Sequence, residues 1–399
     1  MLSLSHPLDQ ISLGKIVQIR ERLLQAAARG ATVYRFESGD PSFAVAPHVL
    51  AALTAAADAG KTHYIPNNGI PELRAALAEK ARAKNGLAGV RADDVFVTNG
   101  AMHALYVTFR ALLAPGDEVI VPDPMWTEAV ENVRLAGGVP VAVPLWAHDA
   151  YAYRPDAITA ALTPRTTAIF LNSPHNPTGA VLSEPTLHRI LELAREHVLW
   201  VIADEAYEDV LYPPARHVSI GSLAGDYAER VISIYSFSKS HAMSGLRTGY
   251  VVTRAPVLHE RLPKLLRCTI NGVNSVTQWA ALAAVTGEQG HIAAMRAEYL
   301  RRRDLMLEAL SGIDGVRPFV PPGAFYLWVE LDASVYARLG VRDADELSEL
   351  LAARGLGSAP GSAFGRHGAD ALRFAFSCST EMVREGSALL RETLRGARP

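Results

Sequence analysis

Short apolar runs alternate with amphipathic stretches through the middle of the chain. The first run, residues 95–98, predicts a buried strand, and residues 101–113 predict the helix that follows it. Strands that alternate with helices favour a mostly parallel sheet with helices on both faces. The pattern therefore predicts an α/β fold. The further strand-like runs are residues 118–121, 139–143, 167–171, 199–203 and 231–234, and the further helices are 128–135 and 187–196.

The pattern changes near Gly290 and becomes mixed. Residues 293–310 predict one long amphipathic helix. After it come strands at 325–331 and 372–376 and helices at 344–354 and 381–395. This order predicts a second, smaller α+β domain that residues 290–399 form together with residues 1–46. Residues 47–289 would then form the large domain.

Length and charge narrow the class of protein. The chain has 399 residues, enough for two domains and a large core, and 49% of them are apolar. A net charge of −2 gives no reason to expect a nucleic-acid or anionic-membrane partner. No stretch approaches the ~20 apolar residues of a membrane helix, and the N-terminus lacks the pattern of a secretory signal. We expect a cytoplasmic protein.

Cysteine and histidine positions argue against a disulfide framework and a metal site. The two cysteines, Cys268 and Cys378, are too few for a disulfide scaffold. No group of cysteines and histidines has the spacing of metal ligands. We therefore expect no metal.

The strongest local signal follows the strand at 231–234. Ser236, Ser238, Lys239 and Arg247 leave that strand in close succession. In an open α/β sheet this edge is where ligands bind. Hydroxyl and guanidinium groups bind phosphate oxygens, and a lysine amine condenses with an aldehyde. The segment indicates a site for a phosphate and a carbonyl together, with a solvated polar loop as the alternative.

Three further segments carry polar groups at strand ends. Asp204 ends the run at 199–203 and could pair with a buried cation, although it could also cap a helix. Tyr207 follows it and can form a hydrogen bond with a phenolate oxygen. Asn176 lies in a turn fixed by two prolines and a glycine. The turn at 98–102 opens a helix whose free backbone N–H groups attract phosphate.

Together these segments resemble the pyridoxal-phosphate (PLP) dependent aminotransferases of fold type I, in the class I/II group that includes aspartate aminotransferase. The resemblance covers nearly the whole chain, and the motifs Asn-Pro-x-Gly, Asp-x-x-Tyr and Ser-x-Ser-Lys occur in the family's order. It implies a large domain with a seven-stranded, mostly parallel sheet flanked by helices, and a smaller α+β domain. It also implies ping-pong transamination between an L-amino acid and a 2-oxo acid, as part of amino-acid metabolism.

The resemblance assigns cofactor roles residue by residue. Lys239 would hold PLP as a Schiff base and then move the proton between substrate and cofactor. Asp204 would keep the pyridine nitrogen protonated, while Tyr207 and Asn176 would bond the phenolic oxygen. Trp126 would stack on the ring. The phosphate would be held by Ser236, Ser238, Arg247 and the turn Gly100, Ala101 and Met102 with its backbone amides.

Two residues would hold the substrate carboxylate. The amide of Gly39 would meet it, and Arg373 would grip it with two parallel bonds, next to Asn176 and Trp126. Tyr64 resembles a tyrosine that reaches the phosphate of the neighbouring subunit. The resemblance therefore implies a homodimer with shared active sites.

The donor and the reaction type are less constrained by the sequence. Acidic-substrate enzymes of this branch often carry a lysine at the position of Met102, so methionine leans toward a neutral, apolar or aromatic donor. A β-eliminating C–S lyase, or a related fold type I enzyme, would use the same lysine and aspartate, although the Asn-Pro-Thr-Gly and Asp-Glu-Ala-Tyr forms favour a transaminase. A dinucleotide oxidoreductase would need a Gly-x-Gly-x-x-Gly turn. A ligand sensor would need a DNA-binding segment, and the motifs from Gly39 to Arg373 fill the chain.

Overall fold

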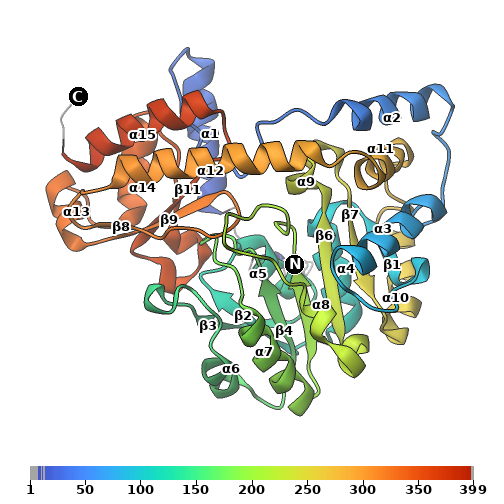
Figure 1. Cartoon of the computed structure of the whole chain (residues 1–399). Coiled ribbons are helices and arrows are strands. Elements are labelled where there is room, and N and C mark those ends of the chain that lie inside the picture. Colours follow the sequence, from blue (N-terminus) through green and yellow to red (C-terminus); the bar gives the residue numbers. More distant parts are fainter. Residues whose placement is uncertain (1–7, 10, 12–13, 397–399) are drawn as a thin grey trace, which may run out of the picture.

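Two β-sheets organise the chain, and helices cover both (Figure 1). The structure is a computed structural model that describes residues 8, 9, 11 and 14–396. The larger sheet has seven strands in the order β1-β7-β6-β5-β4-β2-β3. Its strands are β1 (Val95–Thr98), β2 (Glu118–Asp123), β3 (Val139–Pro144), β4 (Thr166–Asn172), β5 (Trp200–Asp204), β6 (Val231–Ser236) and β7 (Gly249–Thr253).

Most strands of this sheet are parallel because helices connect them. Strands β3, β2, β4, β5 and β6 pair in parallel, whereas β7 runs antiparallel to both β6 and β1. The link from β6 to β7, residues 237–248, is shorter than the links between the successive parallel strands, which suits an antiparallel return. The parallel strands therefore end at one common edge of the sheet.

Helices bury both faces of the large sheet. Side chains alternate along β4, with Phe170 facing one core and its neighbours Ile169 and Leu171 facing the other. The first core includes side chains of α4, α5 and α10, and the second includes side chains of α6, α7 and α8. The bounds are α4 (Gly100–Leu112), α5 (Thr127–Leu135), α6 (Pro155–Ala161), α7 (Glu184–Glu196), α8 (Ile220–Leu223), α9 (Phe237–Ser240) and α10 (Pro256–Thr269).

A third core lies at the β1–β7 end of the sheet. Side chains of α2, α3 and α11 pack there against those of β1 and β7. These helices are α2 (Pro47–Asp58), α3 (Pro71–Ala83) and α11 (Ser275–Thr286).

The smaller sheet is formed by C-terminal strands and is antiparallel, in the order β10-β11-β9-β8. The long helix α12 extends from this region toward α11 (Figure 1) and packs against α15. It buries Met295, Tyr299, Arg302, Met306 and Leu310, which recur at three- and four-residue steps. The elements are α1 (Lys15–Ala28), α12 (Gly290–Leu310), β8 (Val316–Pro318), β9 (Tyr326–Leu331), α13 (Ala333–Leu339), α14 (Ala344–Ala353), β10 (Ala359–Pro360), β11 (Ala371–Ala375) and α15 (Thr380–Leu394).

The structure confirms the expected α/β class, with a seven-stranded, mostly parallel sheet and a separate small sheet. Strands β7, β8 and β10 were not expected from the sequence. The division of the chain at residues 47 and 290 stays a prediction. Within the part of the chain that the structure describes, no helix is both long enough and apolar enough to cross a membrane.

Candidate active site

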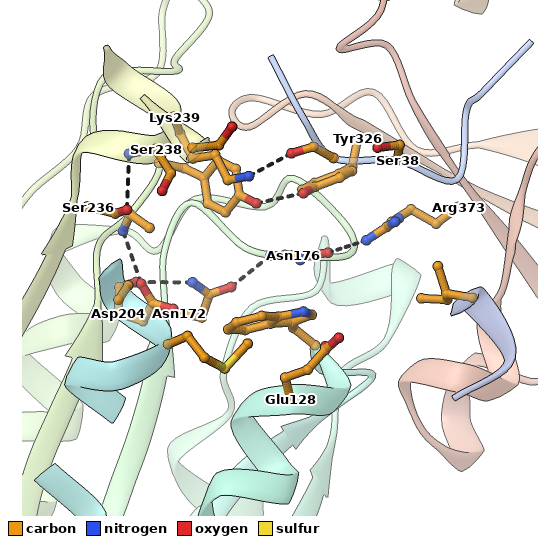
Figure 2. A pocket seen from close by; sticks show the side chains of 18 of the residues that line it. Ser38, Glu128, Asn172, Asn176, Asp204, Ser236, Ser238, Lys239, Tyr326 and Arg373 are labelled. Atoms are coloured by element: carbon orange, nitrogen blue, oxygen red, sulfur yellow. Dashed lines mark hydrogen bonds between the residues drawn. The ribbon is translucent and has the colours of Figure 1, made fainter. Parts of the chain in front are cut away.

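A cavity of about 330 Å³ opens where the central strands of the large sheet end (Figure 2). Three neighbouring strands contribute their last residues to its lining: Asn172 from β4, Asp204 from β5 and Ser236 from β6. Asn172 and Asp204 are direct partners in the strand pairing. The parallel sheet therefore brings together motifs that are far apart in the sequence.

Lys239 reaches this cavity from α9, the short helix that begins directly after β6. Its Nζ donates a hydrogen bond to the carbonyl oxygen of Gly39 at 2.6 Å. Burial lowers the pKa of Lys239 to about 8, because the interior disfavours the charged ammonium. A substantial share of this amine is therefore neutral near physiological pH, which is the form that attacks carbonyls.

Asp204 is buried at the floor of the same cavity. Its Oδ1 accepts a hydrogen bond from the backbone N–H of Ala206 at 3.1 Å, and the side chain of Asn172 donates to its carbonyl oxygen at 3.1 Å. Burial raises the pKa of Asp204 to about 7. A carboxylate in this environment is stabilised by a bound cation or by a proton.

Two buried tyrosines meet in the wall of the cavity. The hydroxyl groups of Tyr207 and Tyr326 lie 2.6 Å apart and share a hydrogen bond. Burial raises the pKa of Tyr207 well above its ordinary value, so its hydroxyl stays protonated and can donate. Any side chain at Gly39 would collide with Tyr326, because an added Cβ would lie 2.3 Å from its hydroxyl oxygen. Glycine at this position lets the backbone approach the cavity.

Arg373 comes from β11 of the small sheet and is buried at the other side of the cavity (Figure 2). Its Nη1 donates to Oδ1 of Asn176 at 2.9 Å, and its Nη2 donates to the carbonyl oxygen of Glu37 at 2.8 Å. Its Nε is buried and has no hydrogen-bond partner among the described residues. A buried guanidinium with a free donor is suited to bind a carboxylate.

An anion cradle lies at the start of α4. Asn99 precedes this helix without capping it through its side chain, so the first backbone N–H groups are free to bind an anion. Gly100 has a φ of +77°, and an added Cβ would lie 2.5 Å from Nη2 of Arg247. Arg247 itself donates to the carbonyl oxygens of Ser244 and Asn99. Ser236 and Ser238 line the same cavity.

The structure brings most of the expected site residues into this one cavity. The expected residues that line it are Gly39, Ala101, Met102, Trp126, Asn176, Asp204, Tyr207, Ser236, Ser238, Lys239, Arg247 and Arg373. Gly100 lies behind Arg247 and shapes the cradle. Tyr64 does not line the cavity in the single chain, and 91% of its surface is exposed.

Sequence reasoning missed several lining residues. Tyr326, Glu128 and Asn172 all line the cavity, as do Glu37 and Ser244. Asn172 could have been found, because it begins the Asn-Ser-Pro-His-Asn-Pro segment at a strand end. Tyr326 and Glu128 carried no such signal, since one lies within an apolar strand run and the other within an ordinary amphipathic helix.

Comparisons with known proteins agree with this geometry. The sequence model of the family "Aminotransferase class I and II" matches residues 31–388. The chain is 38% identical to a probable aspartate/prephenate aminotransferase of Thermus aquaticus, over 94% of this chain and 95% of that protein. It is 36% identical to an arginine–pyruvate transaminase of Pseudomonas aeruginosa, over 92% and 91% of the two chains.

Solved structures of aminotransferases have the same fold as this chain. The fold superposes on aspartate aminotransferase from Thermus thermophilus with maleate at a TM-score of 0.91 and 34% identity, covering 98% of this chain and 99% of the other. The sheet order, the strand-end cavity and this likeness define a fold type I enzyme of the aminotransferase kind. The chain belongs to the aminotransferase class I and II family, whose members generally depend on PLP. It is a transferase, and the named relatives favour transamination over the β-eliminating C–S lyase alternative.

Proposed function

We propose that this aminotransferase binds PLP in the strand-end cavity, with Lys239 as the amine that holds the cofactor and Asp204 as the partner of its ring nitrogen. The reaction is ping-pong transfer of an amino group from an L-amino acid to a 2-oxo acid. The observation that carries the proposal is that one cavity brings together the half-buried Lys239, the buried carboxylate of Asp204 and an anion cradle.

The residues present fit PLP chemically. The uncapped start of α4, with Arg247 and two serines beside it, is a donor set for a phosphate dianion. Asp204 is a buried carboxylate for which a protonated ring nitrogen would be the matching cation. Trp126 lines the cavity as an aromatic surface for a planar ring. Tyr207 and Asn176 offer donors for a phenolic oxygen.

When bound, PLP supplies an aldehyde that captures amines and a ring that takes up the electrons released at the substrate α-carbon. The chain supplies the proton transfers and the binding. The neutral amine of Lys239 would remove the α-proton of the substrate and deliver it to the carbon of the cofactor that held the aldehyde. Asp204 keeps a proton on the ring nitrogen, because its buried charge is best compensated there. The guanidinium of Arg373 and the amide of Gly39 orient the substrate carboxylate.

Several features of the assembly complete the proposal. Tyr64 is exposed in the single chain, which suits a residue that completes the phosphate site of a partner subunit in a homodimer. We further propose a large domain over residues 47–289, a small domain formed by residues 1–46 with 290–399, and a cytoplasmic location. The relatives are named for aspartate, prephenate or arginine, so family membership alone does not fix the donor.

Substitution of Lys239 tests the proposal. The purified protein should carry a visible absorption band, and borohydride reduction followed by peptide mapping should place the cofactor mass on Lys239. Lys239→Ala should lower kcat by about a thousandfold or more while still binding PLP. The control is Lys264→Ala, which removes an exposed lysine paired with Glu260. Normal turnover in Lys239→Ala, or cofactor attached to another lysine, would refute the assignment.

A further inference from the structure

Glu128 places a carboxylate inside the proposed active site, where none of the roles above needs one. It lies in the first turn of α5, two residues after Trp126, and lines the cavity. Figure 2 shows its side chain rising from α5 on the side of the cavity opposite Tyr326 and Ser38. It therefore faces the space that a substrate side chain enters once its carboxylate is held at Arg373.

The charge of Glu128 is not neutralised by a neighbour. Within the described part of the chain, it forms no ion pair at 4.0 Å or less. Glu128 is exposed in the open cavity of the single chain. Desolvation by the groups around it still raises the pKa of its carboxyl, while a backbone hydrogen bond and the positive charge of Arg373 oppose that shift. A carboxylate in such surroundings gains most from a ligand that brings a positive charge or several N–H donors.

A second cavity, of about 500 Å³, continues from the first along α5. The two cavities share five lining residues, which are Ile16, Val17, Met102, Glu128 and Arg247. Further along lies Glu131, whose Oε1 pairs with Arg134 at 3.0 Å. Its Oε2 is buried without a hydrogen-bond partner. The second cavity is thus lined by apolar residues together with the carboxylates of Glu128 and Glu131 and the cations of Lys15 and Arg247.

The cations near this route are mostly engaged elsewhere. Nζ of Lys15 pairs with Asp345 at 2.8 Å, and Arg247 is bound to two backbone carbonyls beside the anion cradle. Burial lowers the pKa of His103 to about 4, which leaves it neutral. Arg20 is the exposed cation at the rim of the first cavity.

We propose that Glu128 sets the donor class, selecting L-amino acids whose side chain ends in a guanidinium or ammonium group. The inference rests on the proposed function, since it assumes that Arg373 holds the substrate carboxylate. The aliphatic stem of such a donor would lie against Met102 and Val17, and its cationic head would meet Glu128. A donor with a distal carboxylate would face Glu128 with like charge. This proposal departs from the neutral, apolar or aromatic donor that Met102 suggested in the sequence. Met102 would contact the apolar stem of the donor, whereas Glu128 would bind its cationic end.

Two measurements test the inference on the PLP-loaded protein. The first compares the rate of the donor half-reaction, followed by the cofactor spectrum, for L-arginine, its neutral isostere L-citrulline, L-leucine and L-glutamate. The second measures by calorimetry the dissociation constants of 4-guanidinobutanoate and 5-guanidinopentanoate against their ureido isosteres, which carry no α-amino group and do not react. The variants are Glu128→Gln, Arg20→Gln and, as a matched loss of charge at the surface, Glu192→Gln.

In the wild type, kcat/KM for L-arginine should exceed that for L-citrulline by about tenfold to a hundredfold, as expected for a hydrogen bond between charged groups. The guanidino acids should bind more tightly than the ureido acids by a similar factor. Glu128→Gln should abolish both preferences and raise the rate with L-glutamate, whereas Glu192→Gln should change neither.

Two results would overturn the inference while leaving the proposed function intact. One is equal reaction with arginine and citrulline in the wild type. The other is a preference for L-glutamate that Arg20→Gln abolishes, which would make the rim arginine the selecting residue. A protein whose cofactor spectrum responds to no amino acid would instead refute the proposed function itself.

Discussion

Asp204→Asn should have opposite effects on the protein with and without its cofactor. Asp204 is buried at the end of β5, and its Oδ1 accepts a hydrogen bond from the N–H of Ala206. Asparagine keeps this acceptor and nearly the same shape while removing the charge. The substitution therefore isolates the electrostatic role of the residue.

The size of the effect follows from the pKa. Burial raises the pKa of Asp204 from 3.8 to about 7. Because the folded pKa is raised, stability is greatest below the unfolded pKa and is lost as pH rises from about 4 through about 7. In the cofactor-free protein at pH 8 the ionised carboxylate then costs up to about 4 kcal/mol, at ~1.4 kcal/mol per pKa unit. Asp204→Asn should recover a large part of this at pH 8 and almost none at pH 4.

Urea unfolding of the cofactor-free wild type and variant, at one protein concentration and at pH 4, 6 and 8, measures this difference. Asp226→Asn, which changes an exposed aspartate, is the control and should show little difference at any of these values. Added PLP should reverse the order of stability of the two proteins. The carboxylate of the wild type can pair with a protonated ring nitrogen, whereas the asparagine of the variant cannot, so PLP should raise the Tm of the wild type more. If Asp204→Asn destabilises the cofactor-free protein equally at all three pH values, the residue does not carry a buried charge and the reasoning is wrong.

Two further substitutions test the phosphate cradle and the buried ion pair. Gly100→Ala places a Cβ 2.5 Å from Nη2 of Arg247, whereas Gly116→Ala has a similar φ of +89° and no atom within 4 Å. Both substitutions should cost about 1 kcal/mol of backbone strain. Only Gly100→Ala should weaken PLP binding, by about tenfold or 1.4 kcal/mol in a fluorescence titration. Equal PLP affinities of the two variants would contradict an anion cradle at this turn. Burial alone would raise the pKa of Glu208, but the positive charges of Lys80 and Lys84 lower it to about 2. The ionised Glu208 with its lysine partners therefore stabilises the fold above about pH 4.5, and this contribution is lost as the pH falls through about 2. Lys80→Met should lower the free energy of unfolding, measured in urea at pH 7, by about 3 kcal/mol. The control Lys264→Met removes an exposed lysine and should lower it by less than about 1 kcal/mol. A loss as small as that of the control in Lys80→Met would refute a stabilising buried pair.

The order of strands and helices could be predicted because both faces of the large sheet are covered. Each central strand is an almost continuous apolar run, such as β5 with its residues Val201, Ile202 and Ala203, and such runs stand out between polar turns. Strand β10 has only the two residues Ala359 and Pro360, too few to show any period. Strand β7 was not expected from the sequence although its residues are mostly apolar, and the pattern of apolar residues does not reveal that it runs antiparallel to its neighbours.

The residues proposed to hold the cofactor could be predicted because they follow strands of the large sheet. Asp204 and Ser236 end strands, and Lys239 follows directly, so the parallel sheet alone brings them to one edge. The position of Arg373 was available only through the family resemblance, because it comes from β11 of the other sheet. Nothing in the spacing of the chain indicates that this arginine would lie beside Asn176.

The residues that would select the substrate lie on helices, whereas those that would perform the chemistry lie at the ends of strands or directly after them. Glu128 projects from a helix face, and Val17 comes from α1 near the start of the described chain. Their orientation depends on how α1 and α5 pack around the cavity, and an amphipathic helix presents a glutamate on its polar side whether or not a ligand lies there. Tertiary packing therefore decides which polar residues of these helices meet the substrate. A substitution in α1 or α5 can change the preferred donor while Lys239, Asp204 and Arg373 stay in place, so a family with one set of catalytic residues can contain members named for aspartate, prephenate and arginine.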